Sequence, residues 1–125
     1  MAILLHGTTR YRAERIVSYG PDLDFIEPGG GPPADEFSAL LDTGRTDVVG
    51  SAEEYAIRKA TNFPGEGGPV VLAVEVPDAI VELTFDAFLP RSQGLVQFDR
   101  EGEALRLLLQ AWPGLPKQIR QVQTP

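Results

Sequence analysis

The chain has 125 residues, a length that suits one domain with a single buried core. It contains no cysteine and one histidine, which excludes a disulfide scaffold, a cysteine nucleophile and a zinc site built from thiolates or several histidines. Its net charge of −7 argues against binding of long nucleic acid, because neutralising phosphates requires surplus lysine and arginine. The apolar runs are too short for a membrane span, and the first residues lack the features of a signal peptide, so a cytoplasmic location is expected.

The charge is unevenly distributed along the chain. Residues 1–20 carry three arginines and one glutamate, whereas residues 21–54 carry nine acidic residues and one arginine. The basic segment contains the single histidine, His6. Such a segment can simply be a solvated helix face. The acidic segment would suit contact with a basic partner.

The first elements follow from a short apolar run and a capping pattern. Residues 2–5 are continuously apolar, which predicts a buried strand. Thr8 or Thr9 can cap a helix over about residues 9–19, which has apolar positions on one face. Gly20, followed by proline, is expected to end that helix.

The middle of the chain is divided by two loops rich in glycine and proline, at residues 28–33 and 64–69. Residues 37–41 are expected to form a short strand, and Val48-Val49 to form another strand or a packed loop. Ser51 and Glu54 have the spacing of a capping box, which predicts that a helix begins at Ser51 and continues to about residue 61.

The last third of the chain predicts mainly strands. Residues 70–76 are rich in β-branched residues and nearly all apolar, as in a strand inside a sheet. Apolar and polar residues alternate over residues 79–85, which are expected to form a half-buried strand. Another short strand is expected at residues 95–98. A helix is expected over about residues 101–112, with its leucines and Trp112 in the core, and then a last strand at 118–122. This order predicts an α+β fold with a mainly antiparallel sheet.

The segment that follows the first strand has side chains suited to a nucleotide. The strand delivers His6 to its end, and Gly7 allows a ligand to approach the backbone and pair with it through a carboxamide. His6 and Thr8 can reach ribose hydroxyls. Arg10 and Arg12 on the next helix have the fork geometry that suits a pyrophosphate. The alternative is a histidine that ends a strand and hydrogen-bonds locally.

His6-Gly7-Thr8, followed by a helix with Ala13 and Ile16 and then by Gly20, resembles the opening motif of the ADP-ribosyltransferase superfamily. The resemblance covers residues 1–76. It implies a single domain over residues 1–125, with a split, mainly antiparallel sheet and two to three helices.

The family's second motif is a strand ending in serine or threonine, followed by a helix whose aromatic residue stacks on nicotinamide. Ser38 and Ser51 are both candidates for the strand end, and Tyr55 is the candidate stacking residue. The resemblance also implies NAD as the substrate and roles for His6, Gly7, Thr8, Arg10 and Arg12 in holding it, without a metal.

The third motif of the His-Tyr-Glu enzymes is a catalytic glutamate at a late strand, which stabilises the oxocarbenium-like transition state. Here Gln93-Gly94-Leu95 places a leucine at that position. Glu101 lies just after the strand and can supply a carboxylate from there, whereas Gln93 or Gln97 would offer a hydrogen bond without charge.

Two main hypotheses follow, and a third, an RNA-modifying relative, is disfavoured by the net charge. In the first, the chain is an NAD-dependent ADP-ribosyltransferase, similar to bacterial toxins and effectors, which transfers ADP-ribose to a protein acceptor or hydrolyses NAD. The small size is consistent with a toxin that has a neutralising partner. In the second, the chain is a binding module that kept the fold and lost the catalytic glutamate.

Overall fold

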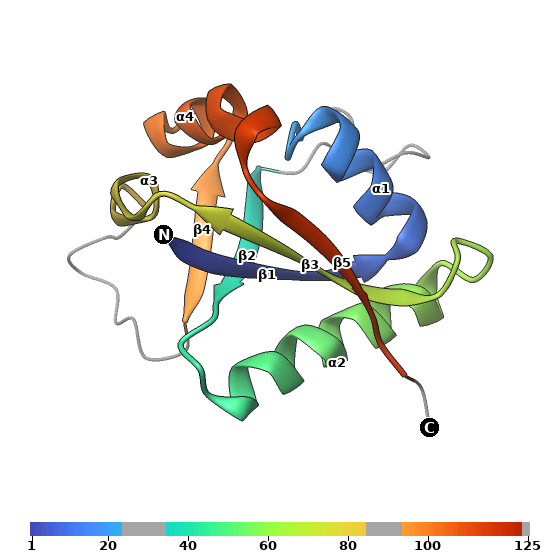
Figure 1. Cartoon of the computed structure of the whole chain (residues 1–125). Helices are drawn as coiled ribbons and strands as arrows, with labels where there is room; N and C mark the ends of the chain where they lie inside the picture. Colours follow the sequence, from blue (N-terminus) through green and yellow to red (C-terminus); the bar gives the residue numbers. More distant parts are fainter. Residues whose placement is uncertain (24–34, 85–93, 124–125) are drawn as a thin grey trace.

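A computed structural model of the chain describes residues 1–23, 35–84 and 94–123. Within these residues, five strands form one antiparallel sheet in the order β4-β2-β1-β3-β5 (Figure 1). The strands are β1 (Ala2–Thr9), β2 (Glu36–Leu41), β3 (Pro69–Val76), β4 (Leu95–Asp99) and β5 (Lys117–Gln121). The helices are α1 (Arg10–Tyr19), α2 (Thr46–Asn62), α3 (Asp78–Glu82) and α4 (Glu103–Ala111), and a 3₁₀ turn, η1 (Trp112–Gly114), precedes β5.

The sheet is covered on both faces. Helix α2 packs on one face, whereas α1, α3 and α4 lie on the opposite side (Figure 1). Adjacent residues of β1 therefore enter different cores: Leu4 packs with α1 and α4, and Leu5 packs with α2. The same alternation places Leu72 in the first core and Val71 in the second, which explains why β3 is continuously apolar from Val70 to Val74 rather than alternating.

Most of the expected elements are present. Helix α1 spans the predicted residues and is capped by Thr9, whose hydroxyl accepts from the Arg12 amide; Gly20, with φ +82°, ends it. The strands expected at 37–41, 70–76, 95–98 and 118–122 correspond to β2, β3, β4 and β5 within one residue or so. The α+β class and the antiparallel sheet are confirmed.

The strand predicted at residues 79–85 is wrong, because Asp78–Glu82 form helix α3. Ile80 and Val81 are adjacent and both buried in the same core. A strand sends neighbouring side chains to opposite faces, whereas one helical turn can bury both on one side. This helix also brings the number of helices in the described residues to four, above the two to three expected.

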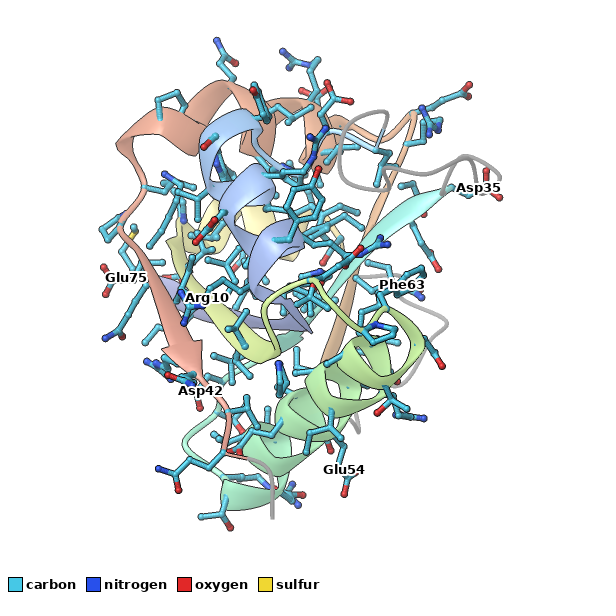
Figure 2. All side chains as sticks on the ribbon, turned by 90° about the vertical axis from the view of Figure 1, so that its right-hand side faces the viewer. Arg10, Asp35, Asp42, Glu54, Phe63 and Glu75 are labelled. Carbon is cyan, nitrogen blue, oxygen red and sulfur yellow. The ribbon has the colours of Figure 1, made fainter. Side chains whose placement is uncertain are left out.

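The predicted beginning of α2 at Ser51 is also wrong. The helix begins at Thr46, so Ser51 is an exposed residue inside it and the Val48-Val49 pair is helical. Val48 is buried against the sheet, which favours extending the helix by more than a turn. Glu54 lies on the outer side of α2, away from the sheet (Figure 2).

Helix α4 likewise begins at Glu103 rather than at residue 101. Its leucines and Trp112 are in the core as expected, and the Trp112 indole donates to the Val17 carbonyl oxygen at 3.1 Å. None of the helices in the described part of the chain is both long and apolar enough to cross a bilayer.

Candidate functional site

Strands β1 and β2 are neighbours in the sheet and separate at His6, which lies inside β1 rather than at its end as expected. Strands β1 and β2 are paired only at Leu4↔Leu41 and Leu5↔Leu40. Beyond this point β1 continues alongside β3 and β2 continues alongside β4, and the two pairs of strands run at a steep angle to one another (Figure 1). The sheet is therefore split between β1 and β2.

A side-chain hydrogen bond crosses this split. The His6 Nδ1 lies 2.7 Å from the Ser38 carbonyl oxygen. Because a carbonyl oxygen only accepts, the proton of this bond resides on Nδ1. The imidazole ring also packs on Phe37, with ring centroids 4.6 Å apart, so the ring is fixed from two sides.

A pocket of about 480 Å³ opens at the split, on the face that α2 covers. Its size falls in the range typical of small-molecule sites, roughly 300–1,000 Å³. Residues of β1, β2, α2 and β4 line it, namely Leu5, His6, Gly7, Ser38, Ala39, Leu40, Ala52, Tyr55, Arg58, Lys59, Asn62, Leu95 and Gln97. The pocket thus brings together His6 and Tyr55, which the sequence places in separate motifs.

One wall of the pocket is a face of α2. Tyr55, Arg58, Lys59 and Asn62 have the spacing i, i+3, i+4 and i+7, which places them on adjacent turns of one side of a helix. The Arg58 guanidinium lies 4.7 Å from the centre of the Tyr55 ring. This contact occupies one face of a ring that is half exposed.

Strands β2 and β4 each contribute one polar side chain to the pocket, Ser38 and Gln97. Ser38 of β2 is in register with Gln97 of β4, and the Gln97 amide donates to a Glu36 carboxylate oxygen at 3.1 Å. The floor between the two sides is aliphatic. No carboxylate is found among the described residues that line this pocket.

Gly7 has a role that the sequence did not indicate. A Cβ at this position would lie 2.1 Å from the Ala52 carbonyl oxygen and 2.8 Å from the Ala56 amide nitrogen, both backbone atoms of α2. The absence of a side chain therefore allows the helix to lie directly on β1. Gly7 also lines the pocket, but the close approach that requires glycine is made by α2.

The residues that follow Gly7 lie outside the pocket. Thr8 and Thr9 are fully buried, and Thr9 donates to Glu66 Oε1 at 2.8 Å. Arg12 is 2% exposed and donates to the same oxygen at 2.8 Å. Its guanidinium also stacks on the Phe63 ring. Phe63 lies directly after α2 (Figure 2).

Glu66 is thus the acceptor of a buried cluster. Burial pushes the pKa of its carboxyl upward, but the hydrogen bonds from Arg12 and Thr9 and the charges of Arg12 and Lys59 outweigh burial and hold the pKa below its ordinary value. Arg10 is not part of this cluster and its side chain is 4.0 Å from Glu14 on the protein surface. The two arginines expected at a pyrophosphate therefore lie away from the pocket.

Of the two candidate serines, Ser38 lines the pocket and Ser51 does not. Glu101 is exposed in the turn between β4 and α4, beyond the end of β4 that pairs with Glu36, and does not line the pocket. Gln93 lies outside the described residues. Leu95, which stands at the position expected for the catalytic glutamate, lines the pocket, and so does Gln97.

Arg58, Lys59 and Asn62 were missed by sequence reasoning. Their spacing relative to Tyr55 could have revealed them, since it places all four on one helix face. Comparisons with family models, with curated proteins and with solved structures find no match to this chain.

Proposed function

We propose that the pocket binds NAD and that the chain is an ADP-ribosyltransferase-like protein. The observation that supports this most directly is that His6 and Tyr55 line one pocket, at a split in the sheet. The two residues come from the two motifs on which the resemblance rests. Had they lain on different faces of the sheet, the two motifs could not have served one ligand.

The pocket offers complementary contacts for the nicotinamide half of NAD. The aliphatic floor and the face of Tyr55 that Arg58 leaves open suit a planar aromatic ring. The His6 imidazole, held by the Ser38 carbonyl, would orient a ribose hydroxyl, and the Gly7 backbone would pair with the carboxamide. Ser38 and Gln97 add polar groups on the other side.

The proposed reaction is glycosyl transfer. The bond between the nicotinamide nitrogen and the ribose carbon breaks, and nicotinamide leaves with the bonding electrons. An acceptor nucleophile, from a protein or from water, then forms the new bond to that carbon and loses its proton. His6 and Tyr55 would position the ring and the ribose for this step.

A second candidate function is favoured by the composition of the pocket. Its described lining contains two cations, Arg58 and Lys59, and no carboxylate. Cations beside the ribose disfavour an oxocarbenium-like transition state, which a carboxylate would stabilise. In this alternative the domain binds NAD without cleaving it, and its acidic segment, residues 21–54, contacts a basic protein partner.

The two functions are separated by measuring binding and cleavage together. We expect NAD to raise the melting temperature of the wild-type protein and His6→Ala and Tyr55→Ala to abolish this shift. Tyr19→Ala is the matched control, because Tyr19 is an exposed tyrosine on α1 outside the pocket. Absence of any shift in the wild type would refute the NAD site.

Release of nicotinamide is then measured on the same samples. Release by the wild type that is lost in His6→Ala supports the transferase, whereas binding without release supports the non-catalytic module. Glu101→Gln is expected to leave both readouts unchanged, because Glu101 lies outside the pocket. A loss of nicotinamide release in Glu101→Gln with intact binding would instead place that carboxylate in the reaction.

A further inference from the structure

The α2 wall of the pocket concentrates positive charge in a strongly acidic protein. Arg58, Lys59 and Asn62 all line it, and all three side chains carry hydrogen-bond donors. The described residues opposite them contribute serine, glutamine and aliphatic groups rather than acids. A ligand in this pocket therefore meets net positive charge, although the chain as a whole has a charge of −7.

The donors of this wall are held in place by aromatic neighbours. Arg58 lies over the Tyr55 ring at 4.7 Å, and Lys59 Nζ lies 5.6 Å from the centre of the Phe63 ring. Stacking restricts the guanidinium without consuming its hydrogen-bond donors, so less side-chain entropy is lost when an anion binds. The charge of Lys59 also acts on Glu66, outside the pocket.

Arg10 and Arg12, the arginines that the sequence predicted at a pyrophosphate, have other partners. Arg12 is enclosed with Glu66 and Phe63, and Arg10 lies near Glu14 on the surface. Neither lines the pocket. A phosphate group that enters beside His6 and Tyr55 would therefore meet the donors of α2 first.

We infer that Arg58, Lys59 and Asn62 form a diphosphate subsite, so that the pocket recognises nucleoside diphosphates such as ADP and ADP-ribose as well as NAD. This inference rests on the proposed function for the orientation of the ligand, with the nicotinamide half at Tyr55 and His6. The guanidinium fork of Arg58 suits two oxygens of one phosphate, and the Lys59 ammonium suits the other phosphate. The Asn62 amide donates to the bridging region.

A diphosphate subsite on α2 would also shape the reaction. ADP-ribose is what remains when nicotinamide leaves and water takes its place. If most of the binding free energy comes from the diphosphate, the product competes with NAD, and nicotinamide alone binds weakly. In this arrangement the diphosphate contacts come from α2, while His6 of β1 and Tyr55 of α2 orient the nicotinamide half.

The test compares the binding of four compounds by calorimetry: NAD, ADP-ribose, ADP and nicotinamide. The variants are Arg58→Gln, Lys59→Gln and the double variant, and Arg106→Gln is the control because Arg106 is an exposed arginine on α4 outside the pocket. Each charge-assisted contact is expected to be worth about 10-fold or more in affinity. The double variant should therefore bind ADP and ADP-ribose at least about 100-fold more weakly, with unchanged circular dichroism.

Arg58→Lys keeps the charge and removes the fork, so it should bind ADP with an affinity between wild type and Arg58→Gln. ADP affinity should also fall as the salt concentration rises. Equal binding of ADP to wild type and to the double variant, or no binding of ADP to wild type, would overturn the inference.

Failure of this inference is distinguishable from failure of the proposed function. If NAD binds and the double variant binds it equally well, the diphosphate subsite is refuted while the NAD site stands. If ADP binds in a manner that needs Arg58 and Lys59 while NAD gives no signal, the NAD site is refuted and the subsite stands.

Discussion

Replacing Gly7 by alanine tests the closest contact between β1 and α2. The added Cβ would lie 2.1 Å from the Ala52 carbonyl oxygen, 2.8 Å from the Ala56 amide nitrogen and 3.1 Å from the Tyr55 Cβ. Two of these atoms belong to the helix backbone, so no side-chain rotation relieves the overlap. A normal separation requires α2 to move away from the sheet by about 1 Å or more.

This displacement weakens the core beneath α2. Ala52 and Ala56 pack there with Leu5 and Val71, and a gap of about 1 Å forfeits up to about half of each dispersion contact. Overpacking of this kind costs about 3 kcal/mol. For a domain of this length, that lowers the melting temperature by about 10 °C. Urea unfolding and thermal unfolding both measure the effect.

Gly50→Ala is the matched control, because Gly50 lies inside α2 and a Cβ added there would have no atom within 4 Å. Alanine there should stabilise the protein by about 0.5–1 kcal/mol through helix propensity. An unfolding free energy of Gly7→Ala within about 0.5 kcal/mol of wild type would refute the close packing of α2. Full stability with loss of NAD binding would show instead that the glycine serves the ligand.

Three further predictions concern the buried cluster and the helix ends. Glu66→Gln leaves the buried Arg12 guanidinium without its carboxylate and should cost about 3 kcal/mol in unfolding free energy near pH 7. Because the folded-state pKa of Glu66 is lowered, its contribution is present above its unfolded-state pKa of about 4.3 and is lost as pH falls through the folded value. The difference between wild type and Glu66→Gln should therefore shrink in urea titrations below about pH 4, and a constant difference would contradict this origin. Thr9→Ala removes a helix cap and a buried hydrogen bond and should lower the unfolding free energy by about 2 kcal/mol. Ser51→Ala should change the unfolding free energy by less than about 0.5 kcal/mol, because Ser51 is exposed inside α2. If thermal melts showed equal losses of stability for the two variants, Ser51 would act as a helix cap after all.

Elements with local signals could be predicted from the sequence. Strand β3 has a β-branched run between two prolines, and α1 has a threonine cap at one end and a glycine at the other. In each case the pattern and the boundary residues agree, and the structure follows them. The leucines of α4 have helical spacing, and Leu105 and Leu108 are buried while Leu109 packs against the same core partly exposed.

Prediction failed where the segment was too short to show a period, as in α3, or where a capping pattern did not mark the first residue of the helix, as in α2. Five residues of α3 are too few to separate a period of 2 from a period of 3.6, and the position of α3 is set by burial of Ile80 and Val81 at the end of β3. For α2, the capping-box spacing at Ser51 is matched by chance. Its actual first turn has no side-chain cap, and burial of Val48 decides where the helix begins.

In the candidate site, too, residues with a local sequence signal could be predicted, and residues whose role depends on tertiary contacts could not. His6 and Tyr55 could be predicted because each lies in a recognisable local pattern. The burial of Arg12 could not be predicted from the sequence, because its partner Glu66 lies in a loop that contacts α1 only in the folded chain. The arginine whose sequence position suggested a ligand contact therefore stabilises the fold, while Arg58, within a helix that the sequence did predict, lines the pocket.

The charge of −7 and a cationic pocket are compatible because they act over different distances. Screening at physiological salt limits the reach of surface charges to about 8 Å. For the nucleotide proposed to bind in the pocket, the nearest cationic side chains would be Arg58 and Lys59, which line it. Acidic side chains such as Asp42, Glu54 and Glu75 lie on other parts of the surface (Figure 2), where they would repel a long polyanion that reached them. The negative net charge is therefore compatible with the proposal that the pocket binds a small phosphorylated ligand.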